Sequence, residues 1–140
     1  MSKRRSLIAA VLLGLAVAGT ARAGEGKPAE PGTSVEMPIL VAPMVVDERL
    51  QAYAYISCTI VATSSAAAIA IRLKTPFIRD AFVRDVNGKP VIKADAPDKF
   101  DTDAVRARLL ADARRVTGAD NVAALIFTQV QISPMRTGGP

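Results

Sequence analysis

The residue types that most often carry enzyme chemistry are scarce in this chain of 140 residues. It contains no histidine, no tryptophan and a single cysteine. A Ser-His-Asp triad, a Cys-His dyad, a His-ligated zinc site and an imidazole general base are therefore excluded. Glycine-rich phosphate loops, paired catalytic carboxylates and nucleophile elbows are missing as well. We therefore expect a protein that is not an enzyme and that uses no cofactor and no metal ion.

Two groups of residues could still do chemistry, and both have a simpler interpretation. Four aspartates lie between residues 95 and 103, but their spacing lacks the central glycine and distal glutamate of an EF-hand calcium loop. We interpret them as a solvated loop followed by a helix cap. Cys58 alternates with Ile56 and Ile60, which predicts a buried thiol that behaves as a small hydrophobic residue.

The charged residues indicate a surface rather than an active site. Arg79-Asp80 and Arg84-Asp85 place opposite charges along one segment, with Asp80 and Arg84 four residues apart. They form either a solvated face or a polar interface with a partner subunit. In the second case Arg79 and Asp80 contribute to the interface. The arginines between residues 106 and 115 are interrupted by Asp112 and have no aromatic residues among them. We therefore expect no nucleic-acid partner.

Residues 1–23 have the three parts of a secretory signal peptide. A basic cluster at residues 3–5 precedes an uncharged run from Leu7 to Gly19, and a small-x-small cleavage pattern ends at Ala23. This predicts export, cleavage after Ala23 and a periplasmic location, by either the Sec or the twin-arginine route. The run is shorter than the roughly 20 apolar residues that span a bilayer. The alternative is an uncleaved inner-membrane anchor facing the periplasm, and we expect membrane contact only in that case.

Removal of the signal peptide changes the charge balance. Four of the 18 basic residues lie within it, whereas all 13 acidic residues follow it. The mature chain therefore has a net charge of about +1 and no basic field that would attract a nucleic acid. Its length suits one domain with a modest core.

The mature chain divides into a flexible linker at residues 24–36, a folded domain at residues 37–133 and a disordered tail at residues 134–140. The linker contains glycine and proline and few large apolar residues. In the domain, residues 39–46 are apolar but contain Pro43, which predicts an edge strand or a bulge. Alternation from Leu50 to Ile60 predicts a long half-buried strand, which pairs with the first across the turn at Asp47-Glu48.

Two helices follow in the predicted order. Residues 65–86 form one helix kinked at Pro76, or two abutting helices of which the second is capped by Thr75. A competing interpretation is a hairpin across Asn87-Gly88, between residues 82–83 and 91–92. After a loop at residues 89–100, acids at residues 101–103 begin a second helix that ends at Gly118.

A final strand covers residues 122–132. Its alternation places Leu125 and Phe127 on one face, and the opposite face carries Ala124, Ile126, Val130 and Ile132. The order β-β-α-α-β predicts an α+β fold, with an antiparallel-leaning sheet and two helices packed on one face.

Two tyrosines are the best candidates for an interface. Tyr53 and Tyr55 are two residues apart in the long strand, so both rings project from the side opposite Ile56. Amphipathic rings at a polar surface are favoured in interfaces. The alternative is that the linker or a neighbouring strand covers them.

Three stretches of the chain carry a resemblance to a known family. They are the apolar run from Pro38 to Val46, the helical segment Pro76-Phe77-Ile78-Arg79-Asp80-Ala81, and the closing strand around Phe127-Thr128. In this order they resemble the periplasmic domain of FliL, the flagellar basal-body-associated protein, whose first helix contains a pro-x-ile/leu-arg-asp-ala stretch. The resemblance spans about residues 37–133.

The resemblance implies a fold related to the stomatin-like (SPFH) domains, which are non-enzymatic and assemble side by side around membrane machinery. FliL itself sits at the flagellar motor beside the stator, but it usually keeps a longer membrane helix than Leu7 to Gly19. We therefore expect an exported protein that acts by protein–protein contact, with flagellar motor components or with itself. The alternatives are a soluble periplasmic protein of this fold without a flagellar role, and a small periplasmic ligand-binding domain.

Overall fold

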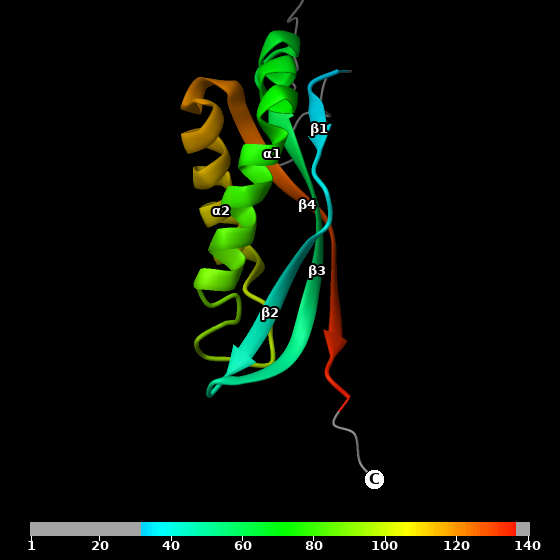
Figure 1. The fold of residues 1–140 in the computed structure, drawn as a ribbon, viewed down its shortest axis with the longest axis vertical. Coiled ribbons are helices and arrows are strands. Elements are labelled where there is room, and N and C mark those ends of the chain that lie inside the picture. Colours follow the sequence, from blue (N-terminus) through cyan, green and yellow to red (C-terminus); the bar gives the residue numbers. More distant parts are fainter. Residues whose placement is uncertain (1–31, 137–140) are drawn as a thin grey trace, which may run out of the picture.

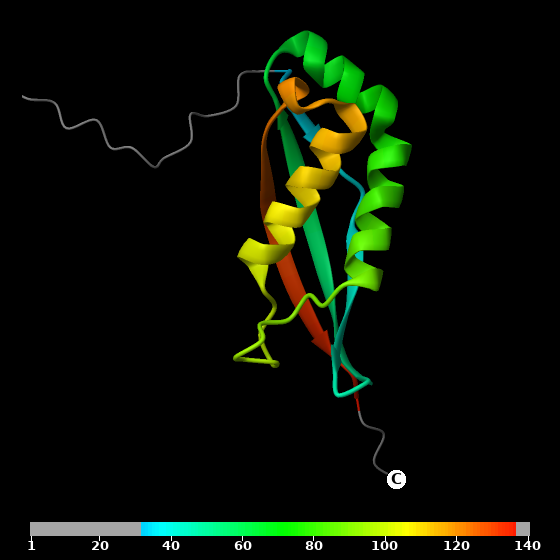
Figure 2. The same cartoon turned by 90° about the vertical axis from the view of Figure 1, so that its left-hand side faces the viewer.

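The computed structural model describes residues 32–136, so the predicted signal peptide and most of the predicted linker lie outside the described residues. The fold is α+β, as predicted, with two helices packed on one face of an antiparallel sheet (Figures 1 and 2). Within the described part, the elements in chain order are β1 (Ser34–Glu36), β2 (Leu40–Val46), β3 (Arg49–Ala62), α1 (Ser65–Gly88), α2 (Thr102–Thr117), the 3-10 turn η1 (Ala119–Asn121) and β4 (Val122–Pro134).

The long strand β3 is the centre of the sheet. Its residues 52–56 pair with β2 along one edge and with β4 along the other, and both pairings are antiparallel. Because residues 59–61 pair with both β1 and β4, β1 lies on the same side of β3 as β2. The predicted hairpin across Asp47 and Glu48 is confirmed. The register of β2 is irregular after Met44, next to Pro43, which fits a proline in an edge strand.

Two boundaries of the predicted domain are wrong. The linker was predicted to extend to residue 36, but Ser34–Glu36 forms β1 and Val35 is buried against the sheet. The tail was predicted to begin at residue 134, but Pro134 still pairs with Ala52, and the amide of Met135 donates to the carbonyl of Gln51 at 2.8 Å. Pairing with the long central strand orders both segments, although neither has a strand-like composition of its own. Residues 137–140 lie outside the described part.

Helix α1 runs without a break through Pro76, and Figure 2 shows that it bends along its length. A proline in a helix interior removes one backbone hydrogen bond and bends the axis. The prediction of a kinked helix is therefore confirmed, and the prediction that Thr75 caps a second helix is wrong. Its hydroxyl donates to the carbonyl of Ile71 at 3.3 Å within the same helix.

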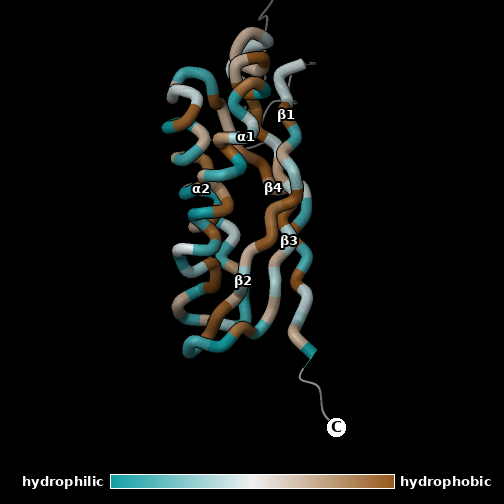
Figure 3. Tube along the Cα trace, in the orientation of Figure 1, coloured by the Kyte–Doolittle hydropathy of each residue, from teal (hydrophilic) through white to brown (hydrophobic). Residues whose placement is uncertain are grey.

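The competing hairpin across residues 87–88 is also wrong. The helix continues to Gly88, and the side-chain amide of Asn87 donates to the carbonyl of Val83 at 2.8 Å. Helix α2 begins and ends where the sequence predicts. The carboxylate of Asp101 accepts from the amide of Ala104 at 3.2 Å, and Gly118 ends the helix with a φ of 97°. In Figure 3 the hydrophobic residues of α2 lie on its sheet-facing side.

The core lies between the sheet and the helices. The prediction that alternate residues of β3 face it is confirmed, because Ala54, Ile56 and Ile60 have no exposed surface. Alanines at the start of α1 are small enough to bring the helix close to the sheet, and Ala68 is fully buried. The largest fully buried side chains are Phe82, Ile56, Ile60, Ile71, Ile78, Leu109, Val86, Val91, Val105 and Val122.

The predicted faces of β4 are wrong because the strand contains a β-bulge. Ser57 pairs with Gln129 and Cys58 pairs with Phe127, so the register skips Thr128. One extra residue exchanges the two faces of a strand beyond it. As a result Leu125 and Phe127 share the helix-facing side with Val130 and Ile132, which pair with core residues of β3. The opposite side carries Ala124 and Ile126.

Candidate functional site

The single cysteine is not placed as a nucleophile. Cys58 lies on the core face of β3 with 3% of its surface exposed. Burial raises the pKa of its thiol from 9.0 to about 11, because a thiolate would lose its hydration. The thiol is therefore neutral at physiological pH and packs as an apolar group, as the alternation of β3 predicts.

The aspartates around α2 have structural partners. Asp101 caps the helix, and the carboxylate of Asp103 accepts from Arg106 at 2.8 Å. Within residues 32–136, no group of three or more histidine, cysteine, aspartate or glutamate side chains is arranged to hold a metal ion.

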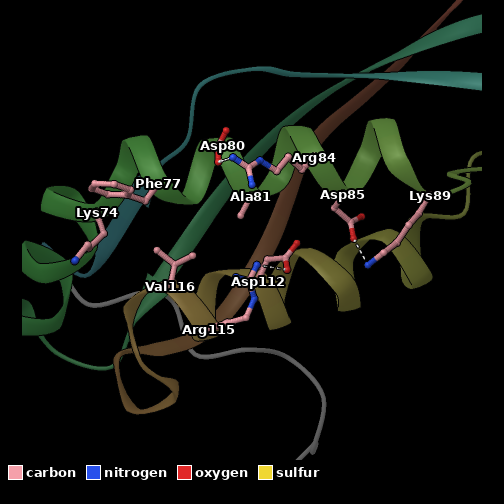
Figure 4. Close-up of a pocket in the computed structure, with 10 residues that line it drawn as sticks. All are labelled: Lys74, Phe77, Asp80, Ala81, Arg84, Asp85, Lys89, Asp112, Arg115 and Val116. Atoms are coloured by element: carbon pink, nitrogen blue, oxygen red, sulfur yellow. Dashed lines mark hydrogen bonds and ion pairs between the residues drawn. The ribbon is translucent and has the colours of Figure 1, made fainter.

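A groove of about 520 Å³ lies between α1 and α2 (Figure 4). Its three aspartates are all paired with cations. Asp80 contacts Arg84 at 2.9 Å, Asp112 contacts Arg115 at 2.9 Å, and Asp85 contacts Lys89 at 3.0 Å. The groove is lined by Lys74, Phe77, Asp80, Ala81, Arg84, Asp85, Lys89, Asp112, Arg115 and Val116. Each carboxylate of the groove is therefore paired with a cation from the same groove.

The structure does not bring Arg79 and Asp80 together in one site. Asp80 lines the groove, paired with Arg84 four residues along α1, whereas exposed Arg79 is not among the lining residues. Neighbouring residues of a helix project about 100° apart, which explains the separation. A polar interface that includes both of these exposed residues stays a prediction.

Asp85 has a role that the sequence pattern did not predict. Its side chain is 2% exposed, and its carboxylate contacts Nε of Arg108 at 2.9 Å as well as Lys89. Arg108 also donates to the carbonyl of Pro90 at 3.1 Å. These contacts join α1, the loop after it and α2. One signal was available, since Asp85 falls on the same helical face as Ile78 and Phe82.

The sheet surface opposite the helices is the larger candidate site, and we call it the open face. Antiparallel partners project to the same side of a sheet, so the strand register identifies its members. Paired residues lie in rows across the strands. Four rows contain one residue from each of three strands, and a fifth row pairs a residue of β3 with one of β4. The fourteen residues are Ser34, Val61 and Ala124; Glu36, Thr59 and Ile126; Ser57 and Gln129; Val41, Tyr55 and Gln131; and Pro43, Tyr53 and Ser133.

The open face is almost free of charge. Glu36 is its one charged residue, and Val41, Tyr55 and Ile126 are 41%, 40% and 49% exposed. Tyr53 and Tyr55 lie on this face as the sequence predicts, and Tyr53 is half-buried. The sequence did not show which residues of the other strands surround them, because that depends on the register of all the strands.

None of the helices in residues 32–136 is both long enough and apolar enough to cross a membrane. Comparison of the chain with protein-family models and with curated proteins gave no match.

Proposed function

We propose that this chain is a non-enzymatic exported protein that acts by protein–protein contact, and that the open face is the surface its partner covers. One observation carries the proposal. The register of the strands collects fourteen side chains on this face, two of them tyrosines and only one charged. Interface cores are depleted of charged residues and enriched in tyrosine.

The open face differs from a sheet face that contacts only water. An antiparallel sheet with one solvated face usually alternates apolar residues inside with polar residues outside, and protein surfaces are rich in lysine and glutamate. Here seven of the fourteen outward positions are polar, but Glu36 alone is charged, and the other seven hold valine, isoleucine, alanine, proline and two tyrosines. Tyrosine contributes a large contact area and a hydroxyl that can find a partner. A protein surface supplies both the apolar area and the hydrogen bonds that such a face requires.

The resemblance to FliL makes flagellar motor components the first partners to test. Pro76 to Ala81, the most specific part of that resemblance, lies in α1 and not on the open face. A second copy of the chain and another exported protein are the other partners to consider. A ligand-binding role is less well supported, because each of the three aspartates in the groove between α1 and α2 is paired with a cation of the same groove.

Site-specific photo-crosslinking in cells that express the chain tests the proposal. The crosslinker replaces Tyr55 on the open face or, as the control, Arg106 on α2, whose side chain has a similar exposure of 43%. We expect a discrete adduct from position 55 and none from position 106. Mass spectrometry of the adduct then distinguishes a motor component, a second copy and another exported protein. Equal adducts from both positions, or none from position 55, would overturn the proposal.

A further inference from the structure

Helix α1 carries exposed apolar residues on a side that faces neither the sheet nor the open face. Ile69, Leu73 and Phe77 are 58%, 75% and 62% exposed. They are spaced by four residues, so they form one line along the first half of the helix, which we call the α1 ridge. The buried residues of this half, Ala68 and Ile71 among them, face the core instead.

In the stretch of sequence that contains the α1 ridge, every charged residue is a lysine or an arginine. No aspartate or glutamate occurs from Arg49 to Arg79, even in the first turn of α1, where an acid would suit the helix dipole. Arg72 and Lys74 lie about 100° to either side of Leu73 around the helix axis. The ammonium of Lys74 is 5.4 Å from the centre of the Phe77 ring.

Two acids lie in the groove beside the ridge, and both are paired with arginines. Asp80 and Asp112 lie in the groove beside Phe77 (Figure 4), and each is paired with an arginine at 2.9 Å. An apolar line with a cation on each side, beside a groove whose carboxylates are paired, is complementary to an anionic, apolar surface.

We propose that the α1 ridge binds the surface of an anionic lipid bilayer. Apolar side chains enter the boundary between headgroups and acyl chains, while lysine and arginine extend to the phosphates. A second copy of the chain fits less well, because two ridges in contact would bring Arg72 and Lys74 against the same cations of the other copy. This surface is separate from the open face, so a protein partner and a bilayer can be bound together.

In the alternative of an uncleaved membrane anchor, the path of the chain also fits a bilayer at this end of the molecule. Nη2 of Arg72 lies 3.4 Å from the carbonyl oxygen of Gly32, where the described chain begins, and 3.3 Å from that of Ser34. β1 and the first turns of α1 accordingly lie at the same end of the molecule (Figure 1). The residues between Gly19 and Gly32 span at most about 45 Å. If the run from Leu7 to Gly19 stays in a membrane, the ridge is within reach of its surface.

A tryptophan reporter tests this proposal in the full chain, which has no tryptophan of its own. Leu73→Trp places the reporter on the ridge. Val83→Trp is the matched control, since Val83 is 40% exposed on the same helix but lies nearly three turns beyond Leu73 and about 80° away from it around the axis. With vesicles of phosphatidylcholine and phosphatidylglycerol, we expect a blue shift and quenching by brominated lipid at position 73 and neither at position 83. The reporter measures contact at the ridge even if another segment also binds the vesicle.

Two further measurements identify the forces involved. Lys74→Gln in the Leu73→Trp background should weaken binding about fivefold at low salt, the usual effect of one cation near an anionic surface. Vesicles of phosphatidylcholine alone should give a much smaller blue shift. An unchanged spectrum at position 73 would overturn the proposal, whether the chain binds anionic vesicles through another segment or does not bind them. So would a blue shift that depends on protein concentration and needs no vesicles, which would indicate self-association.

Discussion

Asp85 is a charged residue in the interior that holds three segments together. Its carboxylate is bound by Arg108 and Lys89, and Arg108 also reaches the carbonyl of Pro90. A buried ion pair adds little stability compared with an apolar pair of the same shape, but removal of one partner leaves the other charge uncompensated. The network therefore fixes how α2 sits against α1 more than it adds to overall stability.

The substitution Asp85→Ala should lower the free energy of unfolding by about 3 kcal/mol, the low end of the range for a broken buried pair, because Arg108 is 26% exposed. Asp80→Ala is the control on the same helix. Asp80 and Arg84 are 60% and 79% exposed, so this loss should stay within about 0.5 kcal/mol. Urea unfolding of both variants measures the difference. Equal losses would show that burial of Asp85 has no energetic consequence.

The buried thiol of Cys58 makes the free energy of unfolding depend on pH in the alkaline range. Its pKa is about 11 in the folded chain against 9.0 in the unfolded chain, because burial disfavours the thiolate. Between these values the folded state holds the proton that the unfolded state has lost, so the free energy of unfolding falls as pH rises from 9 to 11. Relative to Cys58→Ala, the wild type should lose roughly 2–3 kcal/mol over this interval. Parallel pH profiles of the two proteins would contradict the burial argument.

At the scale of the elements, the turn between β2 and β3 combines suitable geometry with unfavourable residues. Asp47 and Glu48 have φ of 48° and 62°, both in the left-handed region. Two positive φ values in a two-residue hairpin define a type I′ turn, which matches the twist of the strands and prefers Asn-Gly or Asp-Gly. Aspartate tolerates this conformation, but glutamate pays a steric penalty.

Glu48→Gly should therefore raise the free energy of unfolding by about 1 kcal/mol, because glycine adopts a positive φ without a clash. Glu36→Gly in β1 is the control, since Glu36 is not among the residues with positive φ. There glycine should lower stability by about 0.5–1 kcal/mol through its greater freedom in the unfolded chain. Thermal unfolding followed by circular dichroism measures both. If Glu48→Gly lowers the free energy of unfolding as Glu36→Gly does, the turn is not strained.

At the scale of the whole molecule, the sheet has one packed face and one open face. Ile56 is fully buried beneath the helices, whereas Tyr53 and Tyr55 project from the other side of the same strand. Stability and partner binding should therefore depend on different residues of β3, although these residues are neighbours in the sequence.

Ile56→Ala should lower the free energy of unfolding by about 2–5 kcal/mol, the usual range for truncation of a buried isoleucine. The double substitution Tyr53→Ala with Tyr55→Ala should leave a folded monomer and weaken self-association or partner binding. Circular dichroism melts and analytical sedimentation measure the two effects on the same samples. If the tyrosine variant unfolds and Ile56→Ala is silent, the open face contributes to the core and the proposed function fails.

The features that depend on local periodicity and capping follow from the amino-acid sequence alone. Alternation in residues 50–60 identified the core face of β3 and the position of both tyrosines, and Pro76 marked the bend in α1. Asp101 and Gly118 bounded α2. These features follow from neighbours one to four residues apart, so the chain specifies them without reference to the rest of the fold.

The features that join distant segments depend on tertiary packing. The bulge at Thr128 exchanged the two faces of β4. Strand β1 formed from residues with no strand pattern, and Asp85 pairs with Arg108, which is 23 residues away in the sequence. The composition of the open face has the same origin, because strand register selects which residues lie beside the tyrosines. Such pairings depend on the packing of the whole core, and a one-residue shift in register reverses them without any change in the local sequence.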